Sequence, residues 1–300
     1  MHILLTGGTG FLGTALSALL LSEGHQLTII TRKPQTVFTR YSGNVRALRR
    51  LTDLTVNDYF DVVINLAGEG IADQPWTKQR KLALYTSRVN LTEELVDWMR
   101  RMKKRPAVLL SASATGWYGN QGSVILDEDS SPHDEYTHQL CNDWEKAALS
   151  AEKMGVRVCI LRTGVVLGRN GGMLKKLLPV FGFNLGGRLG DGQQWFSWIA
   201  LQDYLSAVLF LMTNAKTRGV FNLTAPQPVT NSDFTDELAR LLHRKAFLSV
   251  PSIVLRILMG EMSVLLLGGQ RVLPSRLLDA GFSFRLPSLQ KALQGELALG

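Results

Sequence analysis

The chain has 300 residues, of which 45% are hydrophobic and 19% are charged, and its formal net charge is +8. This length can bury a large core without disulfides, and the composition excludes a disordered chain and a fibrous coiled coil. The positive charge is compatible with nucleic acid, an anionic lipid surface or a phosphorylated ligand as a partner.

The distribution of a few residue types narrows these classes. The densest basic run, Arg100 to Arg105, follows a helical pattern, and cations favour the C-terminal end of a helix, so we interpret it as a helix end and expect no nucleic-acid partner. Cys141 and Cys159 lack metal-ligand spacing, which predicts buried thiols, a reducing cytoplasmic location and no metal site. The best membrane candidate, Ile253 to Leu267, is too short and contains two charged residues, so we expect no membrane segment.

Strand and helix patterns alternate through the first half of the chain. In chain order, we expect strands at His2–Thr6, Gln26–Thr31, Asp61–Leu66, Ala107–Leu110 and Val156–Leu161, and helices at Phe11–Ser22, Thr77–Met102 and Tyr136–Lys153. The strands are almost entirely apolar, as parallel strands covered on both faces must be. This predicts an α/β fold with a doubly wound parallel sheet of the Rossmann type, which binds ligands at the carboxyl ends of its strands.

The longest predicted helix has an apolar stripe at helical spacing. The residues of this stripe are Leu82, Tyr85, Val89, Leu95 and Trp98. We expect them to face the core, and Pro106 to end the helical region.

The pattern changes beyond Arg162. Nine of the 28 glycines fall between Gly164 and Gly192, where we expect a long functional loop. A helix at Ala200–Thr213, a strand at Gly219–Leu223 and a helix capped by Asn231-Ser232-Asp233 follow. We therefore expect a Rossmann domain at residues 1–165 and 195–222, and a small C-terminal substrate-binding or cap region at residues 166–194 and 223–300.

The segment TGGTGFLG, residues 6–13, lies between the first strand and the first helix. Gly7 permits the tight turn, Gly10 lets the backbone approach a pyrophosphate, and Gly13 lets the helix pack closely on the strand. The segment predicts dinucleotide binding, with a purely structural glycine turn as the alternative.

Two strand ends bear on the choice of cofactor. Thr31-Arg32-Lys33 follow the second strand, where NAD sites usually place a carboxylate, and a guanidinium can bind a 2′-phosphate instead, which favours NADP. The small residues of Asn65-Leu66-Ala67-Gly68 allow backbone contact with the adenine ribose. A solvated strand exit is the alternative for both segments.

Over essentially its whole length the chain resembles the extended or atypical short-chain dehydrogenases/reductases, specifically the epimerase family proteins related to nucleoside-diphosphate-sugar epimerases. The motifs that carry this resemblance are TGGTGFLG, NLAG, Ser87-Arg88-Val89, SASATGWYG at 111–119, Trp144-Glu145, LRTGVVLG at 161–168, GGRLGDGQQW at 186–195, and a tail with LPSRL at 273–277, Gly281-Phe282 and Phe284. The tail is similar to the small C-terminal domain of this branch.

The resemblance implies a set of cofactor contacts that extends the glycine loop. The expected cofactor-binding residues are Gly7, Thr9, Gly10, Phe11, Leu12, Gly13, Thr31, Arg32, Leu66, Ala67, Gly68, Arg88 and Val166. Arg88 also makes independent sense as a second cation beside a multiply charged ligand, and an exposed helix charge is its alternative.

The usual catalytic motif of the superfamily is incomplete. It consists of a Ser, a Tyr that acts as general acid/base, and a Lys that lowers the pKa of the Tyr. When Glu145 is aligned with the glutamate that often follows this motif, Thr137 occupies the Tyr position and Cys141 the Lys position. Tyr136 is one residue away from the expected position, and nothing in this helix supplies the lysine cation.

Two hydroxyls remain as candidate catalytic groups. Ser113 could polarise a carbonyl and Tyr118 could donate a proton, if Arg162 or the nicotinamide supplies the missing positive field. Stabilisation of the local loop is the alternative for each. Gln193 to Trp198 combine amides and aromatics that suit a flat or sugar-like ligand, with core packing as the alternative for Trp198.

We therefore expect an NADP(H)-binding oxidoreductase or sugar-nucleotide-epimerase-like enzyme that acts on a small carbonyl or sugar-type substrate. The alternative is a non-catalytic NADP(H)-binding sensor that has lost the Tyr-Lys pair. The expected partner is a small molecule rather than nucleic acid or a membrane, and a homodimer is left open.

Overall fold

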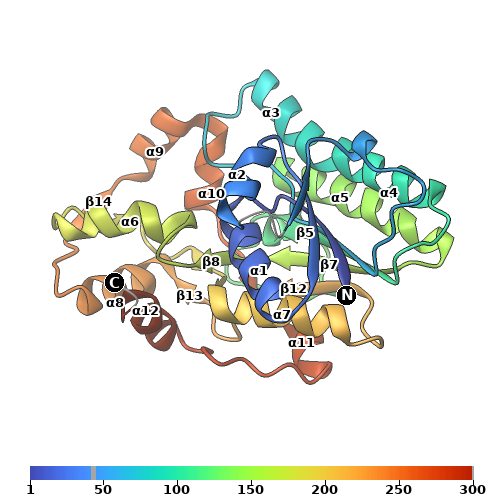
Figure 1. The fold of residues 1–300 in the computed structure, drawn as a ribbon. Coiled ribbons are helices and arrows are strands. Elements are labelled where there is room, and N and C mark those ends of the chain that lie inside the picture. Colours follow the sequence, from blue (N-terminus) through green and yellow to red (C-terminus); the bar gives the residue numbers. More distant parts are fainter. Residues whose placement is uncertain (42–44, 299–300) are drawn as a thin grey trace.

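A computed structural model describes residues 1–41 and 45–298, so residues 42–44 and 299–300 of the expected domains lie outside the described residues. Its centre is a seven-stranded sheet in the order β12-β7-β5-β4-β1-β2-β3 (Figure 1). The strands are β1 (His2–Thr6), β2 (Gln26–Ile30), β3 (Arg46–Leu48), β4 (Val62–Asn65), β5 (Val108–Ala114), β7 (Arg157–Thr163) and β12 (Gly219–Leu223). Every pair is parallel, which confirms the predicted doubly wound sheet.

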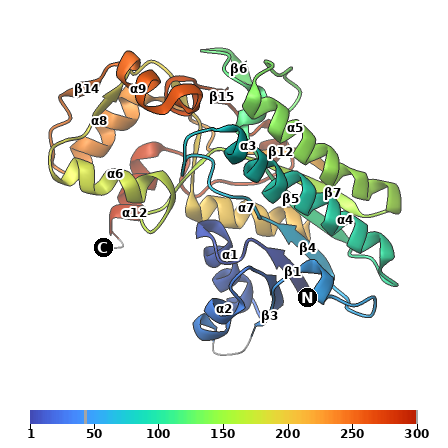
Figure 2. The ribbon, with the colours of Figure 1, turned by 90° about the horizontal axis from the view of Figure 1, so that it is seen from above.

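Helices cover both faces of this sheet, as Figure 2 shows. One layer contains α1 (Phe11–Ser22), α2 (Pro34–Arg40) and α7 (Leu201–Thr213), and the other contains α3 (Lys78–Tyr85), α4 (Leu91–Arg101) and α5 (Tyr136–Leu149). Ile3 and Leu5 belong to the core on the α1 face, and Leu4 belongs to the core on the α4 face. This alternation follows from the two-residue period of a strand, and it explains why β1 is apolar at successive positions.

The predicted helix at Thr77–Met102 is interrupted by a π-helical turn at Thr86–Asn90. Val89, Leu95 and Trp98 are buried as predicted, but Leu82 is 65% exposed and Tyr85 is 37% exposed, so their placement in the buried stripe was wrong. A π turn inserts an extra residue and rotates the preceding helix relative to the following one. A stripe drawn with one constant period therefore fails across residues 86–90.

The long loop expected between Gly164 and Gly192 is also wrong in part, because this segment contains regular elements. They are β8 (Val165–Leu167), α6 (Gly172–Gly182) and β9 (Gly187–Leu189). β8 pairs with β11 (Trp198–Ala200), and β9 pairs with β14 (Leu248–Val250) far along the chain. Three-residue strands with distant partners leave no periodic pattern in the sequence, and the same holds for β3.

The C-terminal lobe packs around a core of its own that includes Leu174, Phe181 and Phe234. Its helices are α6, α8 (Asn231–Leu241), α9 (Ser252–Met259), α10 (Val264–Leu267), α11 (Ser275–Asp279) and α12 (Leu289–Ala298). The remaining strand pairs are β10 (Trp195–Phe196) with β13 (Val229–Thr230), and β15 (Arg271–Val272) with β6 (Ile125–Leu126). The exact division into two units at the expected boundaries stays a prediction.

Two local details complete the fold. The N-cap of α8 is Thr230, one residue before the predicted Asn231-Ser232-Asp233 cap, and Thr230 and Asp233 form a reciprocal capping box. In the part of the chain that the structure describes, no helix has the length and apolar character needed to cross a bilayer.

Candidate dinucleotide-binding site

The glycine loop joins β1 to α1 at the point where the strand order of the sheet reverses. Gly7 has φ +71°, and a Cβ there would lie 2.5 Å from the Leu66 carbonyl oxygen. A Cβ on Gly13 would lie 2.2 Å from the Gly7 carbonyl oxygen. A Cβ on Gly10, the N-cap of α1, would meet only one atom, at 3.4 Å. Two glycines are therefore required by packing, while Gly10 leaves open space above the helix N-terminus, where an anion is favoured.

A cleft of about 710 Å³ opens beside this loop at the carboxyl ends of β1, β2 and β4. Eight of the thirteen residues expected to bind the cofactor line it: Gly7, Thr9, Gly10, Thr31, Arg32, Leu66, Ala67 and Gly68. The topology thus brings together residues from three separate segments of the sequence, at the place where open α/β sheets bind ligands.

Five of the expected contacts are not among the residues that line this cleft: Phe11, Leu12, Gly13, Arg88 and Val166. The Phe11 ring packs closely on the turn that contains Gly168 and Gly171. A Cβ on Gly171 would lie 2.1 Å from the ring, and a Cβ on Gly168 would lie 2.5 Å from it. Leu12 packs against the core, and Val166 is 8% exposed on β8. The glycine-rich segment therefore makes room for Phe11, which anchors the start of α1.

The cleft contains a charged group that the sequence analysis did not include. The exposed Arg32 guanidinium donates a hydrogen bond of 3.1 Å to Glu69, and the buried Arg80 pairs with the other oxygen of Glu69. Hydrogen bonds from Arg80 and Arg32 lower the pKa of Glu69. Arg49 lines the same cleft and adjoins a neighbouring groove with Arg32 and Lys33. Glu69 directly follows the NLAG motif, and this position in the sequence could have identified it as a residue of the site.

Arg88 is partly buried between the loop that follows β4 and helix α5, rather than on an exposed helix face. Its guanidinium donates hydrogen bonds to the carbonyl oxygens of Glu69, at 2.7 Å, and Leu84, at 3.3 Å. Its Cζ lies 5.4 Å from the Trp144 ring centroid, and a Cβ on Gly68 would lie 3.2 Å from this atom. Burial lowers the pKa of Arg88. Its contact with the cofactor stays a prediction.

The two candidate catalytic hydroxyls belong to one buried polar network. Ser113 donates a hydrogen bond of 2.6 Å to Glu145, which accepts two further bonds, each of 2.9 Å, from Arg162. Arg162 also donates to the Tyr118 hydroxyl at 3.2 Å, and this hydroxyl donates to Asn222 at 2.8 Å. Tyr118 is completely buried, and burial raises its pKa to about 12. Both hydroxyls already have partners, which is the arrangement expected of a structural network.

Helix α5 contains no lysine at the aligned position. Cys141 is buried there, and desolvation raises its pKa to about 12, so the thiol stays protonated. The hydroxyl of Tyr136 is buried without a hydrogen-bond partner among the described residues. Its ring lies 4.8 Å from that of Trp76, and the Lys81 ammonium lies 4.4 Å from its centroid. Tyr136 is the first residue of α5, and it lies one residue from the position that the motif predicts for the catalytic tyrosine.

Two side chains of the expected substrate segment, Gln194 and Trp198, form hydrogen bonds within the fold. Trp198 is completely buried and donates a hydrogen bond to Gln227, which favours the core alternative. Gln194 donates to two backbone carbonyl oxygens. Trp195 remains partly accessible, and the Arg271 guanidinium stacks 4.2 Å from its ring centroid. Gln193 and Trp195 are thus accessible side chains of this segment, and Arg271 of β15 contacts Trp195.

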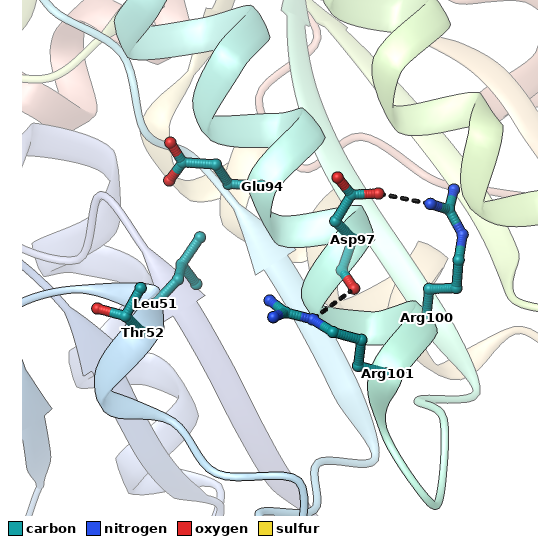
Figure 3. A pocket seen from close by; sticks show the side chains of 6 residues that line it. All are labelled: Leu51, Thr52, Glu94, Asp97, Arg100 and Arg101. Atoms are coloured by element: carbon teal, nitrogen blue, oxygen red, sulfur yellow. Dashed lines mark hydrogen bonds and ion pairs between the residues drawn. The ribbon is translucent and has the colours of Figure 1, made fainter.

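Another groove, of about 500 Å³, lies between Leu51-Thr52 and residues 94–101 of α4 (Figure 3). Arg100 donates to the Asp97 carboxylate at 2.6 Å, and Arg101 donates to the Asp97 carbonyl oxygen at 3.3 Å. Both arginines therefore form hydrogen bonds within their own helix. This agrees with the interpretation of the basic run as the end of a helix. The groove shares Glu94 with the cleft beside the glycine loop.

A parallel sheet, a glycine turn at a helix N-terminus and a cleft at the reversal of strand order define a dinucleotide-binding protein of the Rossmann type. The chain belongs to the NAD dependent epimerase/dehydratase family, whose model matches residues 3–224. A domain of unknown function, DUF1731, matches residues 250–295. These matches confirm the resemblance to the epimerase family branch.

Relatives match over almost the whole chain. Epimerase family protein YfhF of Bacillus subtilis is 36% identical over 303 residues, which cover 99% of this chain and 98% of the relative. A chloroplastic SDR39U1 homolog of Arabidopsis thaliana is 37% identical and covers 98% of this chain and 86% of its own length. The crystal structure of human epimerase family protein SDR39U1 (isoform2) with NADPH has a TM-score of 0.90 at 30% identity, covering 99% of both chains.

Proposed function

We propose that this protein binds NADP(H) in the cleft beside the glycine loop and uses it on a small carbonyl or sugar-type substrate. The observation that carries this proposal is the combination of an open glycine loop at the N-terminus of α1 with Arg32 and Arg49 at one end of the cleft. The human relative solved with NADPH supports the choice of cofactor.

The ion pair between Arg32 and Glu69 is compatible with phosphate binding, because Arg32 can exchange the Glu69 carboxylate for the 2′-phosphate of the cofactor. Arg32 is 86% exposed and can turn toward a 2′-phosphate at a small cost. Glu69 then keeps its buried partner Arg80, so the Glu69 carboxylate stays paired when Arg32 moves. A guanidinium binds phosphate in two-point geometry, which favours NADP(H) over NAD(H) at this end.

Arg88 is the residue that we propose supplies the positive field, because α5 has no lysine at the expected position. The charge of Arg162 is compensated by Glu145, whereas Arg88 has only carbonyl oxygens as hydrogen-bond partners among the described residues. Arg88 contacts the end of β4 and Trp144, which is three residues beyond Cys141 at the expected lysine position. We therefore assign to Arg88 the electrostatic role that a lysine has in related enzymes.

Ser113 at the carboxyl end of β5 is the group proposed to polarise a substrate carbonyl. NADP(H) would supply the hydride chemistry when bound. To contact a substrate, the Ser113 hydroxyl must turn away from Glu145, which keeps its two bonds from Arg162. Tyr118 would have to give up its bond to Asn222, so we place it second to Ser113 as a chemical group.

A non-catalytic NADP(H) sensor is the second candidate function, and one observation favours it. Both candidate hydroxyls are already hydrogen-bonded inside the fold, and no lysine lies at the aligned position of α5. Such a protein would bind the cofactor without oxidising it. The buried free thiols Cys141 and Cys159 support a reducing compartment, such as the cytoplasm, for either function.

A fluorescence titration with NADPH and NADH tests the cofactor assignment. We expect NADPH to bind at least about tenfold more tightly, the ratio that corresponds to about 1.4 kcal/mol. Equal affinity for the two cofactors, or binding of neither, would exclude the proposed site. NADPH oxidation is then followed with a panel of carbonyl compounds and nucleotide sugars. Turnover that Ser113→Ala reduces supports the enzyme, and binding without turnover across the panel supports the sensor.

A further inference from the structure

The C-terminal lobe exposes an unusual concentration of large apolar side chains. Nine of the 17 exposed large hydrophobic residues in the described part of the chain lie in two short segments, 180–185 and 247–258. Six of them are at least 60% exposed: Phe183, Leu185, Phe247, Ile253, Ile257 and Leu258. We call these six residues the apolar patch. Scattered apolar residues are normal on a surface, but a concentration of this kind marks an interaction site.

The two segments of the apolar patch are neighbours in space. The Asn184 side chain accepts a hydrogen bond of 3.2 Å from the Lys245 backbone N–H, and β9 pairs with β14 immediately beyond these residues. Pro251 then connects β14 directly to α9. Both ribbon views place α6, β14 and α9 together at one end of the molecule (Figures 1 and 2). Phe183, Phe247 and α9 therefore belong to one region of the surface.

Helix α9 is not explained by packing within this chain. Only Leu255 of its eight residues is buried, while Ile257 and Leu258 are 76% and 73% exposed. A helix normally turns its apolar stripe toward a core and its polar side toward water. Here Arg256 is the only charged residue of the helix, so its outer side is apolar.

The charges around the apolar patch indicate the chemistry of its partner. Residues 169–190 and 238–260 contain eight Lys and Arg residues and no Asp or Glu, and three carboxylates directly flank these ranges: Asp191, Glu237 and Glu261. Carboxylates from other segments pair with three of these cations, Lys176, Arg188 and Arg240. In the described chain, no carboxylate lies within 4 Å of the four exposed cations Lys175, Arg244, Lys245 and Arg256.

We propose that the apolar patch docks this protein on an anionic lipid surface. The exposed Phe, Ile and Leu side chains would enter the boundary between headgroups and acyl chains, and the four cations would contact lipid phosphates. A second copy of the chain fits less well, because a symmetric contact would bring the same cations together from both sides. Docking of this kind is independent of the cofactor cleft, and it lies beyond the proposed function. It departs from the expectation, drawn from the sequence, that a membrane is not a partner of this chain.

Co-sedimentation with vesicles tests this inference. The vesicles are phosphatidylcholine alone, or phosphatidylcholine with about 30% phosphatidylglycerol. We expect binding to the anionic vesicles only, and weaker binding at high salt because ions screen the cations. The double variant Ile257→Ser/Leu258→Ser should bind at least about tenfold more weakly, since it loses two exposed apolar side chains that would become buried in the bilayer. The variant Lys245→Gln/Arg256→Gln should also bind about tenfold more weakly, or more.

Val124→Ser is the matched control, because Val124 is an apolar residue that is 55% exposed outside the apolar patch, and this variant should bind as the natural chain does. Circular dichroism and thermal unfolding check that each variant folds. Absence of binding to anionic vesicles overturns the inference, and so does equal binding by the natural chain and the Ile257→Ser/Leu258→Ser variant. A dimer that this variant dissociates, without vesicle binding, would identify a second copy as the occupant.

Discussion

Arg162 and Glu145 form a two-point ion pair whose side chains are only 4% and 5% exposed. The pair connects the end of β7 to α5, and Glu145 also accepts a hydrogen bond from Ser113. The Arg162 Cζ lies 3.4 Å from the ring centroid of Trp117. A buried ion pair of this kind orients its neighbours more than it stabilises the fold, since desolvation offsets most of its Coulomb energy. Its geometry therefore fixes the hydrogen-bond partners of Ser113 and Tyr118.

Glu145→Gln should destabilise the fold strongly. The substitution keeps the shape of the side chain but leaves the buried Arg162 charge without a counterion, which costs about 3–5 kcal/mol. Urea unfolding measures the loss. Glu237→Gln is the matched control, because Glu237 also pairs with an arginine, Arg240, but at the surface, and its loss should cost at most about 1 kcal/mol. Equal stability of the two variants would show that the buried pair does not hold this network.

Tyr118→Phe separates the chemical role of Tyr118 from its structural role. Loss of the hydroxyl removes the hydrogen bond to the buried Asn222 and should lower the free energy of unfolding by about 1–2 kcal/mol at neutral pH. Cofactor turnover should change little if the role is structural. A general acid would instead lose about a hundredfold or more. The rate and the unfolding free energy of the same variant therefore distinguish the two roles.

The effect of Tyr118→Phe on the free energy of unfolding should depend on pH in the alkaline range. Burial raises the pKa of Tyr118 from 10.0 to about 12, so the fold favours the neutral phenol. Its contribution to stability is complete below the unfolded pKa and decreases as the pH rises toward the folded value, by about 1.4 kcal/mol per pH unit. The difference in unfolding free energy between the natural chain and Tyr118→Phe should therefore shrink above pH 10.0. A constant difference would contradict the assigned burial.

The sequence predicted the parts of the site that depend on local pattern. The glycine loop and the ends of β1, β2 and β4 lie where the strand and glycine spacing placed them, because each depends on residues close together in the chain. The network of Ser113, Glu145 and Arg162 spans 49 positions from residue 113 to residue 162, so only the fold shows that the hydroxyl already has a partner. Glu69 and Arg88 likewise acquire their roles from contacts between distant segments.

Gly13→Ala should destabilise the protein although alanine is the better helix former. The new Cβ would lie 2.2 Å from the Gly7 carbonyl oxygen and 2.7 Å from the Gly8 Cα, both of which belong to the backbone and cannot rotate away. Overpacking of this kind costs about 1–3 kcal/mol, and it should also displace the loop and weaken NADPH binding. Thermal unfolding and the NADPH titration measure the two effects.

Gly182→Ala serves as the control for this substitution, because a Cβ on Gly182 in α6 meets no atom within 4 Å. It should leave stability unchanged or raise it by about 1 kcal/mol or less. If Gly13→Ala were equally harmless, the close approach of α1 to β1 would not be needed for the site.

Arg32→Ala should remove the preference for NADPH over NADH. Arg32 lines the cleft at the end of β2, and a charge-assisted contact with a 2′-phosphate is worth about 1.5–3 kcal/mol, which corresponds to about a 10- to 150-fold loss of NADPH affinity. NADH lacks this phosphate, so its affinity should stay nearly the same. Arg101→Ala removes the same charge from the groove on α4 and should change neither affinity. If Arg32→Ala lowered the affinities for NADPH and NADH equally, Arg32 would support the cleft through its ion pair with Glu69 and would not bind the 2′-phosphate.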